Sequence, residues 1–513
     1  MHIFKVLFNK FRSLEYSVFA LVTSVSLLFF GGHSTSIDEE TYLAGLRSFL
    51  RGRSYLDMDS VARNTIIAMP GKSGLLTSFY GIGTTIFFLP GYLIGHLSSS
   101  FVAEPYKEQV LRLFLYSTNS FVLGLTALVI YKLCLLNRCT SAVALWASLA
   151  FSFCTFALPS AGTGFSEPLT ALFVITSIYY SAKIPQNGKS RYLAGLSLGC
   201  AILMRASAAI FLPIFIISLC LRSSAGIRFR SVLFFSIGGL LPMIAFLATN
   251  YWKFGSFLDT GYPDLAYNTP ILEGLFGLFV SSGKGLLWFA PISALAIATM
   301  KKSFTRNPSF SILIWMIIGA NSLFFSRFEI WSGDDAFGPR YMGIVLPLFA
   351  VLAGMGVSTV REYPVILTTF AGIPASLSGV LIYVNASNAS RVPGLEQALG
   401  ASSRNIDGGY NWSALRQLTL YIPRHSQLSF QLSQIGEAIS NSWKAMGGAT
   451  SPVPFNLGNS PALGWYIDPV RLDVWWVYWV ESGAPKLFLV FLPLTILSTS
   501  FFALRIRSKS RWS

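Results

Sequence analysis

Three carboxylates stand together near the start of the chain, directly after its first long apolar run. Asp38, Glu39 and Glu40 open a segment whose apolar residues recur at helical spacing, namely Leu43, Leu46, Phe49 and Leu50. A carboxylate beside such an apolar face is partly removed from water, which suits it to act as a general base. The alternative is helix capping, because Ser36 and Glu39 fit a capping box and acids stabilise a helix start. We predict that Asp38 and Glu39 are catalytic.

A further acid, Glu167, lies in a short polar turn between two apolar runs. Its neighbours are Ser166 and Pro168. Because proline suits the first turn of a helix, capping is again the alternative to a functional role. We predict that Glu167 contacts substrate.

Four cations lie near the ends of apolar runs: Lys72, Arg205, Lys284 and Arg340. In the predicted topology these ends lie on the outer side of the membrane. Outer cations run against the usual bias of Lys and Arg toward the cytoplasm. Snorkelling explains any single one of them. Four together favour an anionic ligand such as a lipid phosphate, which Arg binds through two bonds and Lys as a point charge. We predict that all four bind substrate, together with Tyr341, which follows Arg340.

Other chemistry has little support in the sequence. The four histidines share no ligand spacing, so no metal site is predicted, and a divalent cation remains an open cofactor without a clear ligand set. Asp334 and Asp335 resemble a solvated turn more than a cation site. No phosphate-binding Walker loop and no nucleophile elbow is present. The five cysteines lie in or beside apolar runs, and we expect no disulfide framework.

The composition indicates what must position these residues. Hydrophobic residues make up 53% of the 513 and charged residues only 12%. Apolar runs of roughly 15 to 25 residues recur throughout, close to the ~20 needed to cross a bilayer as a helix. We predict an all-α polytopic membrane protein with about twelve transmembrane helices, at 16–30, 110–134, 141–158, 168–182, 192–205, 207–221, 231–249, 285–300, 309–326, 341–359, 364–384 and 485–504.

The distribution of charge orients these helices. The net charge of +16 invites a nucleic-acid hypothesis, but the basic residues form short clusters between apolar runs instead of one patch. With both termini in the cytoplasm, half of the 38 Lys and Arg lie inside, against only Glu15 and Glu362 of the 22 acids. This asymmetry follows the positive-inside rule.

Three long segments then face outward, at 32–109, about 250–284 and 385–484. We divide the chain into a transmembrane region at 1–384 with a catalytic first outer loop at 32–109, a small and irregular extracytoplasmic domain at 385–484, and a final span with a basic cytoplasmic tail at 485–513. The apolar run at 79–97 is ambiguous. We interpret it as an interfacial helix broken at Pro90 and Gly91.

The chain resembles the GT-C superfamily of membrane glycosyltransferases, nearest to the branch of protein O-mannosyltransferases and lipid A aminoarabinose transferases. That branch carries Asp-Glu-x-Arg-Tyr after its first span, and this chain has Asp38-Glu39-Glu40-Thr41-Tyr42, with Thr41 in place of the Arg. Further short motifs follow in the same order along the chain: Ser166-Glu167-Pro168, Gly255 through Tyr262, Gly283-Lys284-Gly285-Leu286 and Gly338-Pro339-Arg340-Tyr341. The segment 385–484 is not covered.

The resemblance implies a GT-C-like bundle and a sugar donor carried on a polyprenyl phosphate. It implies that Asp38 deprotonates an acceptor hydroxyl of a cell-envelope glycan, lipid or protein, and that Glu39 helps to position either Asp38 or a cation. It also implies that transfer inverts the anomeric carbon at the extracytoplasmic face of the plasma (inner) membrane. The rival hypotheses are a transporter or lipid flippase and, because the family Arg is replaced by Thr41, a scaffold that has lost activity. Transporters usually place charges or broken helices near the membrane midplane, whereas the predicted spans here are nearly free of charge.

Overall fold

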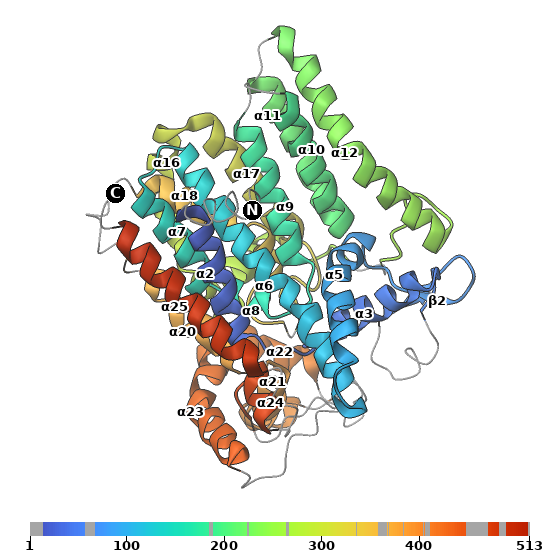
Figure 1. The fold of residues 1–513 in the computed structure, drawn as a ribbon, viewed down its shortest axis with the longest axis vertical. Coiled ribbons are helices and arrows are strands. Elements are labelled where there is room, and N and C mark those ends of the chain that lie inside the picture. Colours follow the sequence, from blue (N-terminus) through green and yellow to red (C-terminus); the bar gives the residue numbers. More distant parts are fainter. Residues whose placement is uncertain are drawn as a thin grey trace.

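The computed structural model describes residues 14–56, 67–183, 188–222, 225–262, 266–334, 336–357, 367, 369–382, 384–403, 405, 411–447, 470–481 and 489–510. Within these ranges the chain is predominantly helical, which confirms the helical part of the predicted fold class (Figure 1). The described strands are β1 (Met69–Pro70) and β2 (Leu76–Thr77), an antiparallel hairpin in which Met69 pairs with Thr77. This hairpin belongs to the first predicted outer segment.

The helices of the bundle are α2 (Leu14–Phe29), α6 (Glu104–Leu136), α7 (Ser141–Phe153), α8 (Ala157–Ala161), α9 (Glu167–Ala182), α10 (Gly188–Met204), η1 (Ala206–Phe211), α11 (Leu212–Arg222), α12 (Ala225–Phe254), α14 (Leu286–Phe289), α15 (Ile292–Ala298), α16 (Met300–Arg306), α17 (Pro308–Ser326), η2 (Arg340–Ile344), α18 (Leu346–Gly356), α20 (Ile373–Leu381) and α25 (Phe491–Ser510). The segments predicted to lie outside contribute α3 (Ile37–Leu50), α5 (Ile82–Ser99), α13 (Ile271–Phe279), α21 (Val384–Leu399), η3 (Gly400–Ser403), α22 (Trp412–Tyr421), η4 (Pro423–His425), α23 (Gln427–Met446) and α24 (Trp475–Glu481).

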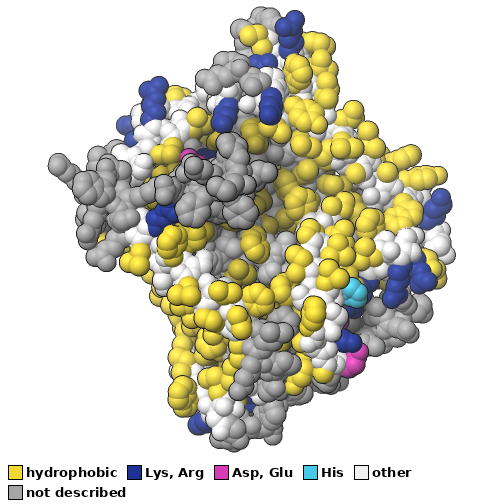
Figure 2. All heavy atoms as spheres, viewed as in Figure 1, with side chains coloured by type: hydrophobic (Ala, Val, Ile, Leu, Met, Phe, Trp, Pro, Cys, Tyr) yellow, Lys and Arg dark blue, Asp and Glu magenta, His cyan; other side chains and the backbone are white. Residues whose placement is uncertain are grey.

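The bundle has an enclosed centre and an apolar exterior. Every residue of α18 is buried. In α12, by contrast, only 17% of the apolar window is buried. Figure 2 shows hydrophobic side chains over the face that includes α12, with Lys and Arg at the end where α12 begins. Since soluble proteins seldom expose so large an apolar surface, this face fits contact with lipid.

Three described helices are long and apolar enough to cross a membrane, at Tyr106–Leu136, Ile227–Phe254 and Pro308–Ser326. Several other predicted spans are shorter or interrupted. The run at 285–300 divides into α14 and α15 around Pro291, and the run at 341–359 begins as the 3₁₀ helix η2 before α18. The count of about twelve spans therefore stays a prediction.

The ambiguous run at 79–97 forms α5, and the predicted break at Pro90 and Gly91 is wrong. The helix continues through Pro90 to Ser99. Its Gly91 lies against the backbone of Phe114, and Gly95 lies against that of Leu111. Because neither glycine has a side chain, α5 packs closely on the first half of α6. This close packing of the two helices helps to keep α5 intact around the proline.

The segment 385–484, expected to be irregular, is mainly helical where it is described. The buried face of α23 carries Gln427, Gln431, Gln434 and Ser442 beside alanines. Because this buried face is largely polar, a search of the sequence for apolar residues at helical spacing does not find the helix. The segment contacts the bundle directly, since the Asp473 amide donates to the Leu381 carbonyl of α20 and the Trp475 indole donates to the Leu27 carbonyl of α2.

Candidate active site

The site begins at the N-terminus of α3. Ser36 has extended backbone, and its hydroxyl caps the helix by accepting from the Glu39 amide at 3.4 Å. The other half of the expected capping box is different, because the Glu39 carboxylate binds the amide of Thr35 instead of that of Ser36. This cap fixes where the three carboxylates of the first turn point.

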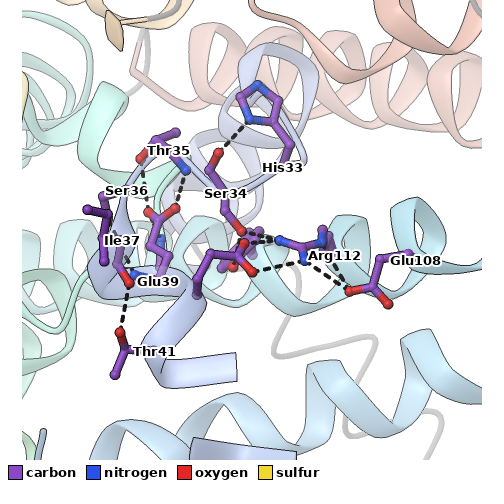
Figure 3. Close-up of polar contacts among 12 residues, drawn as sticks. His33, Ser34, Thr35, Ser36, Ile37, Glu39, Thr41, Glu108 and Arg112 are labelled. Atoms are coloured by element: carbon purple, nitrogen blue, oxygen red, sulfur yellow. Dashed lines mark hydrogen bonds and ion pairs between the residues drawn. The ribbon is translucent and has the colours of Figure 1, made fainter. Parts of the chain in front are cut away.

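Glu39 is wholly buried and joins α3 to the turn before α9. Its Oε1 accepts from the Gly164 amide at 2.6 Å and from the Thr35 hydroxyl at 3.0 Å. Figure 3 shows the contact between Thr35 and Glu39. Asn119 of α6 holds the same turn by donating to the carbonyls of Thr163 and Phe165. Burial raises the pKa of Glu39 to about 7, and the Thr35 and Gly164 amides oppose that rise. Glu39 thus has a supporting role, because it connects the N-terminus of α3 to the turn before α9.

Asp38 faces a different set of partners. Its Oδ1 accepts from the Tyr80 hydroxyl at 2.6 Å, and its Oδ2 lies 2.8 Å from Nη1 of Arg340. Both charged side chains are mostly enclosed, with 17% of Asp38 and 16% of Arg340 exposed. Tyr80 is fixed in turn by Lys253, which donates to the Tyr80 carbonyl at 2.8 Å. An ion pair that joins residues 302 positions apart indicates a site built by the fold.

Arg340 and Arg205 share a second acid. Oε1 of Glu167 is 3.0 Å from Nη1 of Arg205 and 3.9 Å from Nε of Arg340. The Tyr341 ring lies beside both guanidinium groups, with their carbons 5.3 Å and 5.1 Å from its centroid, a cation–π distance. Within the described chain, Nε of Arg205 and Nε of Arg340 are buried without a hydrogen-bond acceptor. These two donors suit an anionic group.

The fold therefore brings together five of the predicted residues: Asp38, Glu167, Arg205, Arg340 and Tyr341. Lys72 and Lys284 have other contacts. Lys72 is exposed and lies over the Tyr251 ring at 4.7 Å. Lys284 is buried and donates to the Ala336 carbonyl, so it holds the segment that leads to Arg340.

An apolar pocket lies inside the bundle next to Arg340 and Glu167. Residues of α6, α7, α8, α9 and α18 line it, among them Val122, Phe151, Phe156, Ala171 and Leu346. Its lining is apolar apart from Thr126, Ser160 and the two charged side chains. A pocket of this kind suits a molecule with a hydrocarbon part and one charged group.

Sequence reasoning missed a buried arginine behind the site. Arg112 of α6 pairs with Glu40, at 3.0 Å between Nη2 and Oε2, and with Glu108 one turn earlier. It also donates to Ser34 (Figure 3). Arg47 of α3 binds both oxygens of Glu108 at 2.8 and 2.9 Å. Glu40 is thus a structural acid, and no short motif around Arg112 signals this pairing.

The residue pattern does not fit a bound metal ion. Among the described residues, no group of three His, Cys, Asp or Glu side chains is arranged to hold one. Asp38 is already paired with Arg340, and the Glu39 oxygens accept from Thr35 and Gly164. Two guanidinium groups also occupy the region between Asp38 and Glu167, where a cation would be repelled.

Comparisons with known proteins give structural neighbours only. No protein-family model matches the sequence, and no curated protein matches it. The chain is similar to the structure of ArnT from Cupriavidus metallidurans bound to undecaprenyl phosphate, at 14% identity and a TM-score of 0.47 over 88% of this chain and 84% of that one. It is also similar to the apo oligosaccharyltransferase of Archaeoglobus fulgidus, at 12% identity and a TM-score of 0.43 over 91% of this chain and 63% of that one.

Proposed function

We propose that this protein is a glycosyltransferase that moves a sugar from a polyprenyl-phosphate donor to an acceptor hydroxyl. The observation that carries the proposal is the Asp38–Arg340 contact beside an apolar pocket. It places a carboxylate that can take a proton next to a guanidinium that can take a phosphate. The apolar lining of the pocket suits the hydrocarbon next to that phosphate. A soluble nucleotide-sugar enzyme has no need of such a pocket.

The transfer is a single displacement. The acceptor oxygen forms a bond to the anomeric carbon while its proton passes to Asp38. The bond from that carbon to the phosphate oxygen breaks, and its electron pair stays on the polyprenyl phosphate. Because attack comes from the side opposite the leaving group, the anomeric configuration inverts. An ionised carboxylate has about four acceptor positions, so the bonds from Tyr80 and Arg340 leave Asp38 able to bind the acceptor hydroxyl.

The leaving group needs charge neutralisation more than a proton, since it departs as a phosphate. Arg340 and Arg205 perform this role through the Nε donors that lack a hydrogen-bond acceptor among the described residues. Glu167 keeps the two guanidinium groups together against their mutual repulsion. Tyr341 supports both through its ring face. Glu39 positions Asp38 by fixing the first turn of α3.

The proposal includes a location. The enzyme lies in the plasma (inner) membrane with both termini in the cytoplasm, and the site faces outward. The acceptor belongs to the cell envelope and is a glycan, a lipid or a protein. In this orientation the inner side holds half of the basic residues but only two acids, Glu15 and Glu362. This asymmetry supports the orientation through the positive-inside rule.

The proposal is tested by removing the base without removing its shape. Asp38→Asn keeps the size and the hydrogen bond from Tyr80 but cannot take a proton. We expect turnover of a polyprenyl-phosphate sugar to fall about 100-fold or more, the usual contribution of a general base. The control is Asp334→Asn, which alters an exposed Asp–Arg pair with Arg416 at 3.0 Å and should leave turnover unchanged. Normal transfer by folded Asp38→Asn protein would remove Asp38 from the mechanism.

A further inference from the structure

Four aromatic rings form one cluster beside Asp38. Tyr42 and Tyr80 have centroids 4.4 Å apart, Phe79 and Tyr80 are also 4.4 Å apart, and Phe79 and Tyr262 are 4.8 Å apart. Tyr42, Phe79 and Tyr80 are each less than 9% exposed, whereas Tyr262 is 40% exposed. Tyr262 therefore presents most of the ring surface that this cluster leaves open.

Tyr262 lies next to the residue that contacts Asp38: its ring centroid is 6.4 Å from that of Tyr80, and the Tyr80 hydroxyl donates to Asp38 at 2.6 Å. Burial raises the pKa of Tyr262 to about 12, Arg205 opposes that rise, and Asp38, Glu167 and Tyr341 add to it. The group stays protonated at physiological pH, so it is a hydrogen-bond donor and not a base.

The backbone conformation before Tyr262 positions its ring. Gly261 has a φ of +67°, and a Cβ at this position would lie 2.0 Å from the Phe254 ring. Its amide donates to Asp259 at 2.8 Å. Phe254 itself packs against the cluster. Glycine at 261 therefore lets the chain cross the Phe254 ring closely enough for Tyr262 to contact Phe79.

We propose that Tyr262, backed by Phe79 and Tyr80, is the platform on which the sugar ring of the donor stacks. The inference rests on the proposed function, since it assigns part of the same site. One face of a pyranose carries C–H groups and packs well on an aromatic face, while its hydroxyls stay free for polar partners. A sugar bonded to a phosphate at Arg340 and Arg205 is one bond from that phosphate. Tyr262, whose ring lies 6.4 Å from that of the Tyr80 that donates to Asp38, is within its reach.

The test compares two lipids on the purified full chain in nanodiscs. One set of probes is a panel of undecaprenyl phosphates that each carry one hexose or pentose, and the other probe is undecaprenyl phosphate without sugar. We expect the wild type to bind its preferred sugar-bearing lipid about 10-fold more tightly than the bare lipid, a typical gain from aromatic stacking. Tyr262→Ala should abolish this preference and leave binding of the bare lipid unchanged. Tyr262→Trp should keep the preference.

Phe257→Ala is the matched control, because Phe257 is an exposed aromatic ring of the same outer segment that stacks on Tyr251. It should behave as wild type. Three results would overturn the inference: a Tyr262→Ala protein that keeps the preference, one that weakens binding of both lipids equally, and one in which only the KM for acceptor changes. A wild type that shows no preference for any sugar would do the same. Sugar preference without any transfer would instead defeat the proposed function and leave the platform standing.

Discussion

Two neighbouring carboxylates at the start of α3 have opposite surroundings. Successive residues of a helix point about 100° apart, so Asp38 meets Arg340 and Tyr80 while Glu39 turns back into the protein. Asp38 keeps a partly open position between a guanidinium and a phenol. Glu39 is closed off by Thr35 and Gly164. The two acids therefore differ in role, although the sequence presents them as one cluster.

The buried Glu39 predicts a pH dependence of stability. Its pKa in the folded protein is about 7, above the ordinary value of 4.5, so folding favours the protonated acid. This contribution is fully present below pH 4.5 and is lost as pH rises through 7. Glu39→Gln mimics the protonated acid and removes the effect. From pH 5 to pH 8, we expect the wild type to lose about 2 to 3 kcal/mol relative to Glu39→Gln, measured as the difference between their thermal transitions.

A second titrating group lies near Glu39. Burial alone would lower the pKa of His33, but the Asp473 carboxylate at 2.6 Å outweighs it and the pKa is raised. The stability contribution of His33 also declines with rising pH. Because His33 and Glu39 act on each other's pKa, this contribution cancels only in part between the wild type and Glu39→Gln. A constant difference between wild type and Glu39→Gln across this range would show that Glu39 is not held in its protonated form.

At the residue scale, the sequence predicted most of the charged site and little of its support. Asp38, Glu167, Arg205 and Arg340 stand out because charge is rare in so apolar a chain. Tyr80 and Tyr262 do not stand out, because a tyrosine near the membrane surface is more often an interfacial anchor. Lys72 and Lys284 were predicted on the same grounds as the two arginines, as cations near the outer ends of apolar runs. The fold gives them other contacts.

At the element scale, the joint between α3 and α6 positions Asp38. Arg112 is 5% exposed, Glu40 is 13% exposed, and the pair ties the first turn of α3 to α6. Arg47 and Glu108 tie the last turn of α3 to the same helix. With both ends held, α3 cannot rotate Asp38 away from Arg340.

Removing one partner of the Arg112–Glu40 pair should lower the stability of the protein. Neutralising both partners should lower it less than the two single changes added together. Arg112→Met leaves Glu40 buried without a cation, which typically destabilises a protein by roughly 3 to 5 kcal/mol. The pair Arg112→Met and Glu40→Gln should lose clearly less than the sum of the two single changes. Thermal unfolding of the four proteins gives the coupling. Lys107→Met is the control, because Lys107 of the same helix pairs with Glu104 at the surface and should change stability by at most about 1 kcal/mol. Strict additivity would mean that the joint does not act as a unit.

Helix boundaries were predictable where apolar runs are plain and not where packing decides them. The runs behind α6, α12 and α17 appear as long helices. The predicted break at Pro90 was wrong because the sequence alone shows only a proline, which usually interrupts a helix. In the structure Gly91 and Gly95 let α5 pack closely on α6, and the helix continues. Pro291 does interrupt its run. Whether a proline ends a helix depended on its neighbours in space, which a sequence does not show.

In the whole molecule, the site lies at one end of the bundle. The first half of α6 borders it through Arg112 and Asn119. At the far end of the same helix, Asn137 and Cys139 contact Asn307 and Arg306. A helix of 33 residues spans about 50 Å, enough to separate two sides of a bilayer. Figure 1 shows α2 beginning and α25 ending away from α22 and α23.

This arrangement predicts which positions are reached from outside. In a variant without native cysteines, Ser402→Cys should react with an impermeant thiol reagent in intact cells. The inner probe is best placed at Thr305, which is exposed, because the nearby Ser303 is buried. Thr305→Cys should react only after the membrane is opened. Protection of the cysteine at 402 in intact cells would refute the orientation.

The most direct test of the central claim asks whether the sugar–phosphate bond is cleaved. Purified protein in nanodiscs receives a polyprenyl-phosphate sugar and a cell-envelope acceptor fraction, and free polyprenyl phosphate and glycosylated acceptor are measured together. We predict that the two products appear in equal amounts, and that both disappear with Asp38→Asn. In sealed liposomes, a transporter or flippase would carry the lipid to the other leaflet with its sugar attached. Translocation of the donor with every molecule recovered uncleaved would contradict the account.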